Sequence, residues 1–205
     1  MEKETFNVFS SRFFRAPWDK GAFLMDKTIT VTKKLVGTAA FAALAFVISF
    51  IEFPVFPAAP FFKLDFSLVF ILLAGFTFGP FSGLCASAVK ELLRFIVGSS
   101  TGGVGEIANL VVTIGFVMLP TVVYVFKKGL PTVMITLAVG CVIQVLLSLL
   151  VNRFVTFPLY MGEAAKDAFN GLWQFIVFFN LIKSVAVSVI TVLVYKRISG
   201  FIKSI

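Results

Sequence analysis

The sequence of 205 residues contains no histidine and only two cysteines, so it has few of the side chains that usually bind metals or transfer protons in enzymes. Cys85 and Cys141 lie within apolar runs without a C-x-x-C pattern, which predicts two small core side chains and neither a disulfide nor a metal site. The chain also lacks the Gly-x-x-x-x-Gly-Lys-Ser/Thr phosphate-binding loop. We therefore expect no catalytic residue, no metal and no cofactor, and any dependence on ATP must come from another subunit.

Charged residues are scarce as well. Only 14% of the residues are charged, whereas 59% are hydrophobic, 27 are phenylalanine and the mean hydropathy is +1.03. These values lie far above the usage of soluble domains and predict an integral membrane protein. The net charge of +8 would suggest nucleic acid for a soluble protein, but here the lysines and arginines lie mainly at the ends of apolar segments. We expect them to set the orientation in the membrane and to contact anionic lipid, with no nucleic acid as partner.

Six apolar segments predict an all-α protein, a bundle of six transmembrane helices. A Gly-Pro pair at 79–80 marks a tight turn between the second and the third, and three prolines between residues 54 and 60 predict a stiff exposed loop after the first. We expect a flexible loop at 98–105 and a polar loop at 159–170. The six segments span residues 35–53, 65–78, 81–97, 107–126, 130–158 and 172–195.

The distribution of basic residues predicts the orientation of the chain. With the N-terminus inside the cell, the expected cytoplasmic segments hold most lysines and arginines, whereas the expected external loops keep only Lys63 and Lys166. We therefore expect both termini in the cytoplasm. Residues 1–34, where basic and aromatic residues are interspersed, predict a cytoplasmic or interfacial segment, with a disordered tail as the alternative. Residues 35–205 form the expected six-helix transmembrane domain.

The last apolar segment carries a polar stripe. Asn180, Lys183, Ser184, Ser188 and Thr191 fall within an arc of about 140° on a helix of 3.6 residues per turn. A lysine at the centre of a membrane helix costs roughly 2.5–3.5 kcal/mol, so its presence requires compensation. A lysine that reaches the membrane surface, or a hydrogen bond between helices, is one interpretation. The other is a ligand-facing stripe, because ionisable groups inside membranes usually mark substrate or ion paths.

Two further polar stripes occur on neighbouring segments. One repeats every four residues from Gln144 through Ser148 and Asn152 to Thr156, and the other consists of Glu106, Asn109 and Thr113. In the predicted topology these stripes and Asn180 reach a similar depth below the external surface. Polar contacts between helices explain any one stripe, but their common depth favours a cavity that opens to the outside.

Two shorter patterns have structural interpretations. Glu91 and Arg94 are spaced for an ion pair within one helix, which we interpret as structural. Ala39 and Ala43 form a small-xxx-small pair, which lets a second helix approach closely.

Several motifs in order along the chain resemble those of one known family. They are Glu52-Phe53-Pro54, the run Phe62 to Ser67 (FKLDFS), Gly75-Phe76-x-Phe78-Gly79-Pro80-x-x-Gly83, Thr101 to Asn109 (TGGVGEIAN) and Asn152 to Tyr160 (NRFVTFPLY). Together they resemble the riboflavin-specific substrate-binding (S) components of energy-coupling factor (ECF) vitamin transporters. The resemblance spans about residues 35–197. Arg153 departs from it, because an aromatic residue is expected there.

The resemblance implies a six-helix protein of the bacterial plasma membrane. Such a protein captures a vitamin outside the cell with high affinity and docks on one membrane-embedded coupling subunit and two cytoplasmic ATPases. By resemblance, Ala39 and Ala43 would contact the coupling subunit. Asn152, Asn180 and Lys183 would hold the flavin ring, and the proline-rich loop after the first helix would act as a lid.

The chemistry of the residues agrees with a flavin ligand. The pyrimidine edge of a flavin has two carbonyl acceptors beside an N–H donor, and asparagine amides and a lysine ammonium complement this pattern. The ribityl hydroxyls would bind Glu106, Asn109 or the backbone at Gly105. Riboflavin is the expected ligand, and FMN is a further candidate.

Other functions stay open at this point. An S component for pantothenate or folate is one alternative, although a single Lys183 argues against the two carboxylates of folate. A standalone ion-coupled carrier of small metabolites is another, but neither a repeated half nor titratable groups at the midplane are visible. A membrane enzyme has little support without histidine or a carboxylate cluster.

Overall fold

The computed structural model describes residues 19–57, 59–99 and 101–204. The chain divides into two compact units, Met1–Val36 and Gly37–Ile205, and each is described by itself. Helix α2 (Asp19–Ile48) begins well before the predicted start at residue 35. The added turns contain Lys20, Ala22, Leu24 and Met25, all good helix formers. Residues 1–18 of the predicted N-terminal segment lie outside the described residues, and the role of that segment stays a prediction.

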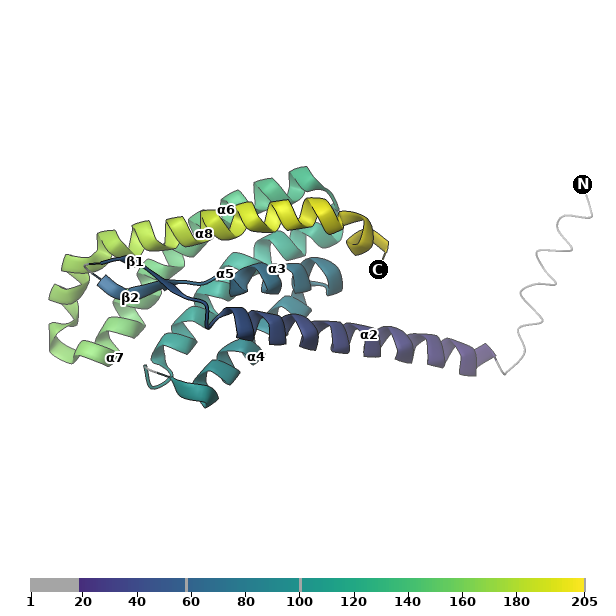
Figure 1. Cartoon of the computed structure of the whole chain (residues 1–205), viewed down its shortest axis with the longest axis horizontal. Helices are drawn as coiled ribbons and strands as arrows, with labels where there is room; N and C mark the ends of the chain where they lie inside the picture. The colour runs from purple at the N-terminus through teal and green to yellow at the C-terminus, as the bar shows by residue number, and fades with distance from the viewer. Residues whose placement is uncertain (1–18, 58, 100, 205) are drawn as a thin grey trace, which may run out of the picture. The chain divides into compact units, whose positions relative to one another are not determined.

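The rest of the described chain is mostly helical, as predicted (Figure 1). Among the described residues, three stretches are long and apolar enough to cross a membrane, namely Val31–Ile48, Val104–Phe126 and Leu130–Gly200. A shorter apolar helix covers Ser67–Phe78. In order, the elements after α2 are β1 (Phe53–Phe56), β2 (Ala59–Leu64), α3 (Ser67–Phe78), α4 (Pro80–Gly98), α5 (Val104–Phe126), α6 (Leu130–Val151), η1 (Asn152–Thr156), α7 (Phe157–Met161), η2 (Gly162–Ala164) and α8 (Ala165–Ser204).

The proline-rich segment after α2, predicted as a stiff exposed loop, is a β-hairpin, so the prediction of a purely helical fold was wrong here. Strands β1 and β2 pair antiparallel, with Phe53 opposite Leu64 and Pro54 opposite Lys63, and the register shifts between Pro54 and Phe56. Proline is compatible with this sheet because each of two strands has one unpaired edge, where a missing N–H is tolerated. The hairpin lies near the start of α8, and β2 contacts that helix (Figure 1).

The segment between α6 and α8 also differs from the prediction. The predicted fifth helix ends in a π-helical turn, η1, and in place of a polar loop at 159–170 the chain forms the end of the short helix α7, the turn η2 and the start of α8. Gly162, at φ +54°, ends α7, and α8 begins three residues later. Pro158 follows η1 without a break in the helix, and the wide turn there accommodates a residue that has no N–H to donate.

The turn between α3 and α4 confirms the prediction from the Gly-Pro pair. Gly79 has φ +103°, a conformation that favours glycine, and Pro80 opens α4. The predicted flexible loop at 98–105 is shorter in the structure, because α4 continues to Gly98 and α5 begins at Val104. Neither cysteine is in a disulfide; Cys141 is buried and Cys85 is half-buried.

The core forms where α3, α5, α6 and α8 approach one another closely. A Cβ added to Gly75 on α3 would lie 2.3 Å from Cγ2 of Thr121 on α5, and one added to Gly115 on α5 would lie 1.9 Å from Cδ1 of Leu147 on α6. Large side chains fill the space between these contacts. They include Leu72, Phe116, Leu137, Val187 and Tyr195, all almost completely buried. Close packing therefore fixes which face of α8 turns toward its neighbours.

We predict that Gly75→Val destabilises the bundle by about 1–3 kcal/mol, because the added atoms overlap a stiff β-branched threonine. Thermal unfolding of the purified protein in detergent measures the change. Gly171→Ala is the control, since nothing lies within 4 Å of its added Cβ and alanine favours a helix. Equal unfolding temperatures for Gly75→Val and the unchanged protein would contradict the close approach of α3 and α5.

Candidate functional site

The polar stripe of α8 faces the interior of the protein. Asn180 and Lys183 are each 7% exposed, and Ser184 and Thr191 are fully buried. Apolar side chains cover the opposite face of the helix and are exposed. These are Leu181, Ile182, Val185, Val189 and Leu193. Lys183 therefore does not extend to the membrane surface, so the interpretation of Lys183 as a lysine that reaches that surface was wrong.

Lys183 forms a buried ion pair with Asp65, the residue that follows β2. Lys183 Nζ lies 2.9 Å from Asp65 Oδ2. The other oxygen, Asp65 Oδ1, accepts hydrogen bonds from the backbone N–H of Ser67, at 2.9 Å, and from the Ser67 hydroxyl. The Asp65 carboxylate thus has a charged partner or hydrogen bonds on both of its oxygens.

Asn180 contacts the polar stripe of α6. Its Nδ2 donates to the carbonyl of Ile176 at 2.9 Å, and its Oδ1 accepts a long hydrogen bond, 3.5 Å, from Gln144 Nε2. The Oε1 atom of Gln144 is buried without a hydrogen-bond partner, as is Oγ1 of Thr156 on the same predicted stripe. Unsatisfied acceptors of this kind are uncommon in protein interiors and often mark a place where a ligand or water completes the hydrogen bonding.

Asn152, which was predicted to hold the flavin ring together with Asn180 and Lys183, lies just beyond the end of α6. It starts the π-helical turn η1, is half-buried, and donates from Nδ2 to the carbonyl of Ser148 at 2.8 Å. At 1.5 Å per residue it is about 12 Å from Gln144 along the helix. Gln144, rather than Asn152, is thus the α6 residue that meets Asn180.

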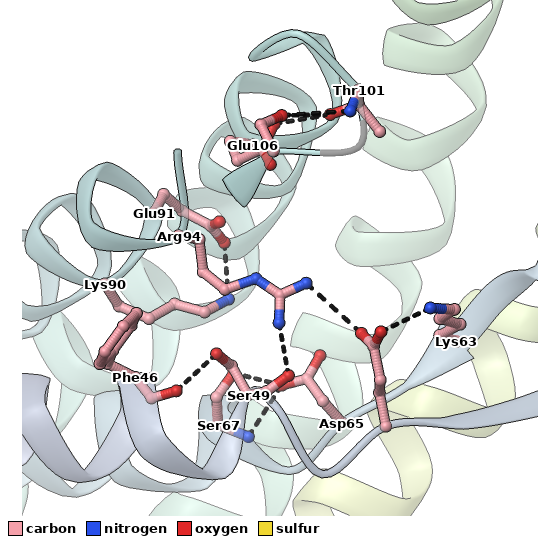
Figure 2. Close-up of polar contacts among 12 residues, drawn as sticks. Phe46, Ser49, Lys63, Asp65, Ser67, Lys90, Glu91, Arg94, Thr101 and Glu106 are labelled. Atoms are coloured by element: carbon pink, nitrogen blue, oxygen red, sulfur yellow. Dashed lines mark hydrogen bonds and ion pairs between the residues drawn. The ribbon is translucent and has the colours of Figure 1, made fainter. Parts of the chain in front are cut away.

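Of the residues expected to bind ribityl hydroxyls, Glu106 and Gly105 form a hydrogen-bonded cluster with Thr101, and Figure 2 shows the contact of Glu106. Thr101 Oγ1 donates to Glu106 Oε2 at 2.6 Å and accepts from the backbone N–H of Gly105 at 3.1 Å. Tyr160 on α7 donates to the Thr101 carbonyl at 2.8 Å. Asn109 is exposed. The cluster joins the α4–α5 connection to α5 and α7, and the ligand roles of Glu106, Gly105 and Asn109 stay predictions.

Aromatic side chains of the hairpin pack against α8 beside the polar stripe. The rings of Phe56 and Phe175 lie 5.4 Å apart, and those of Phe62 and Phe179 lie 5.1 Å apart. Lys183 Nζ is 6.0 Å from the centre of the Phe179 ring. The hairpin therefore lies directly against the part of α8 that carries Asn180 and Lys183.

A chain of charged contacts holds the hairpin to α4 (Figure 2). Arg94 Nη1 donates to the Ser49 carbonyl at 2.7 Å, its Nη2 lies 3.4 Å from Glu52 Oε2, and Lys63 Nζ lies 2.6 Å from Glu52 Oε1. The predicted pair of Glu91 with Arg94 was wrong, because Glu91 pairs with Lys90 at 2.7 Å. Arg94 instead binds the free carbonyl just beyond the end of α2, a position that favours a cation.

Two site residues were missed by the sequence argument. Asp65 carries the charge opposite to Lys183 and was not among the predicted site residues. A buried lysine requires a carboxylate partner. Asp65, a carboxylate directly before an apolar segment, could therefore have been recognised in the sequence as a candidate for that partner. Gln144 was recognised as part of a stripe but not as the contact of Asn180.

These features define a helical membrane protein with a polar, charge-balanced centre beneath an aromatic hairpin. The family described as "ECF transporter, substrate-specific component" matches residues 33–195. The chain belongs to this family of multi-span proteins of the bacterial cell membrane, and it is a transport component rather than an enzyme.

Individual relatives agree with the family. The chain is 34% identical over 178 residues to "Riboflavin transporter RibU" of Staphylococcus aureus, and the alignment covers 84% of this chain and 94% of that protein. It is 29% identical over 182 residues to "Riboflavin transporter FmnP" of Bacillus subtilis, with 83% and 94% covered. A solved structure, "Structure and mechanism of the S component of a bacterial ECF transporter", is 32% identical, has a TM-score of 0.73, and covers 84% of this chain and 98% of that one.

We predict that Arg94→Ala loosens the hairpin, because it removes the contacts to Ser49 and Glu52 that hold it to α4. Amide hydrogen exchange over residues 53–64 should rise by about tenfold, the effect of losing roughly 1.4 kcal/mol from charged hydrogen bonds. Lys127→Ala, an exposed cation between α5 and α6, is the control. Unchanged exchange in the Arg94 variant would show that the other contacts of the hairpin hold it without Arg94.

Proposed function

We propose that this S component captures riboflavin outside the cell and delivers it across the membrane as part of an ATP-driven ECF transporter. The observation that carries the proposal is the buried cluster of Lys183, Asn180 and Gln144, which combines donors and an unsatisfied acceptor beneath aromatic side chains. The relatives named above as riboflavin transporters support the choice of ligand. FMN is a further candidate, since it has the same ring.

The cluster complements the pyrimidine edge of a flavin. An ammonium at Lys183 and the amide N–H groups donate to the two ring carbonyls, and Gln144 Oε1 accepts from the ring N–H between them. Leaving a buried acceptor without a partner costs about 1–3 kcal/mol, so a ligand that supplies the donor gains that amount. Phe62 and Phe179 offer apolar faces for the ring system.

The remaining predicted ligand contacts belong to the same proposal. Asn152 approaches the ring from the external end of α6, and Glu106, Asn109 and the backbone at Gly105 bind the ribityl chain. The hydrogen bond between Glu106 and Thr101 would then adjust when the ligand enters. The hairpin of β1 and β2 serves as the lid, because its aromatic rings already lie on α8.

The helices α2 to α6 and α8 would supply the six spans, with both termini in the cytoplasm. Helix α3 has 12 residues, about 18 Å at 1.5 Å per residue, and is therefore shorter than a hydrocarbon layer of about 30 Å. Exposed basic residues support the orientation, because they follow α5 and lie near the end of α8, on the side assigned to the cytoplasm. They are Lys127, Lys128, Lys196 and Arg197.

Helix α2 presents the surface for the coupling subunit. Ala39 and Ala43 are exposed, whereas Ala42 and Ala45, on another face of the helix, are buried in the bundle. A row of small exposed residues lets a partner helix approach closely. Two ATPase subunits would supply the hydrolysis, for which this chain has no phosphate-binding loop.

Transport of pantothenate or folate by the same site has less support. Both compounds carry carboxylates, and a carboxylate requires an excess of positive charge in a buried site. Lys183 has no such excess, because Asp65 neutralises it at 2.9 Å. The charge balance of the cluster thus favours a neutral ring edge.

The direct test is isothermal titration of the purified protein with riboflavin. Binding at micromolar concentration or below is expected, and Asn180→Ala should weaken it by about 1–3 kcal/mol through the loss of a buried amide. Asn170→Ala, an exposed amide on the same helix, is the matched control and should bind as the unchanged protein does. No heat of binding at micromolar riboflavin would end the proposal, and tight binding of pantothenate or folate would replace it.

The partner surface is tested separately. Ala39→Trp should leave riboflavin binding unchanged but abolish uptake by cells that contain the complete transporter, since the large ring separates the two helices. Ala138→Trp, at an exposed position of α6, should leave both unchanged. Simultaneous loss of binding and uptake in the Ala39 variant would show that this face packs within the protein instead.

A further inference from the structure

We infer that Asp65 is a positioning residue, which fixes the Lys183 ammonium for the ligand and joins the ligand site to the hairpin. The inference rests on the proposed function and extends it to a residue that does not itself contact the ligand. Three observations carry it: the way in which the Asp65 carboxylate is held, the partners of Lys183, and the place of Asp65 in the chain.

The carboxylate of Asp65 is held on both oxygens. Oδ1 accepts from the N–H and the hydroxyl of Ser67, at the start of α3, and Oδ2 accepts from Lys183 Nζ. With one oxygen tied to the backbone of α3, the second oxygen has a defined place. A carboxylate fixed in this way can orient a flexible partner, because it does not move when that partner does.

Lys183 needs such a partner. Its side chain has four rotatable bonds, and ordering them costs about 1.5–2 kcal/mol that a ligand alone would have to offset. The ion pair orders the side chain before the ligand arrives, which is a form of preorganisation. An ammonium has three N–H donors, so Lys183 can hold Asp65 and donate to a ring carbonyl at the same time.

The position of Asp65 links this lysine to the hairpin. Asp65 follows Leu64, the last residue of β2, and Phe62 in the same strand stacks on Phe179, one turn of α8 before Lys183. Two contacts from one short segment therefore bind one turn of α8. A ligand that pulls on Lys183 acts on Asp65 and hence on the strand that covers it, so occupancy of the site and closure of the hairpin are coupled.

A double-mutant cycle in riboflavin affinity tests the inference. Asp65→Asn and Lys183→Met should each weaken binding by about tenfold or more, the range for a buried charged partner. The double variant should bind no more weakly than Lys183→Met alone, because Asp65 acts through the lysine. Glu52→Gln is the matched control: this carboxylate also holds the hairpin but pairs with Lys63 and Arg94, so its effect should multiply with that of Lys183→Met.

A spectroscopic measurement separates positioning from simple stabilisation. A hydrogen bond from Lys183 lowers the stretching frequency of a flavin carbonyl, so this infrared band should shift toward the unbound value in both Asp65→Asn and Lys183→Met. Asp65→Glu, which keeps the charge, should restore most of the affinity and the band. If Asp65→Asn does not fold, Ser67→Ala takes its place, with a few-fold loss of affinity expected in the unchanged background and none in Lys183→Met.

Each result has one meaning. If the unchanged protein does not bind riboflavin, the proposed function fails. If the unchanged protein binds riboflavin, two results contradict the inference. One is that the loss of affinity from the Asp65 or Ser67 variant multiplies with that from Lys183→Met, and the other is that the flavin carbonyl band stays in place in the Asp65 variant. In either case Asp65 has only a structural role.

Discussion

The ion pair between Lys183 and Asp65 is the interaction on which the arrangement of the site depends. A charge in an apolar bundle is tolerated only when an opposite charge and further hydrogen bonds lie beside it. Here the two partners are far apart in sequence, one in the middle of α8 and the other before α3. Because neither can be buried without the other, the pair requires α8, the end of the hairpin and the start of α3 to meet at one point. Asn180 and Gln144 are then brought together one turn away.

The hairpin is attached at both of its ends by charges. At its beginning, Arg94 binds Ser49 and Glu52, and at its end Asp65 binds Lys183. Between these points it rests on α8 through ring contacts such as that of Phe62 with Phe179. The arrangement combines fixed ends with a middle held mainly by ring contacts, which suits the lid that we propose for this segment.

Much of this architecture could be predicted from the sequence. Hydropathy identified the helices, Gly79 and Pro80 identified a turn, and the spacing of Asn180 and Lys183 placed them on one buried face. The strands could not be predicted, because prolines usually indicate loops and the two-stranded sheet depends on rings that pack against α8. The partners of Arg94 and Lys183 were also beyond prediction, since helical spacing reports neighbours within one helix and these contacts join segments far apart in the chain.

The wide turn of η1 has a consequence for how the protein tolerates changes in length. The N–H of Phe157 donates to the carbonyl of Asn152, five residues back, so this turn holds one more residue than an ordinary helical turn. Removal of a single residue there would restore regular winding and leave the segments on either side in place, because the wide turn already absorbs that residue. Tyr160 would then still reach the Thr101 carbonyl. A one-residue gap at this point in a relative is therefore compatible with the same tie between α7 and the α4–α5 connection.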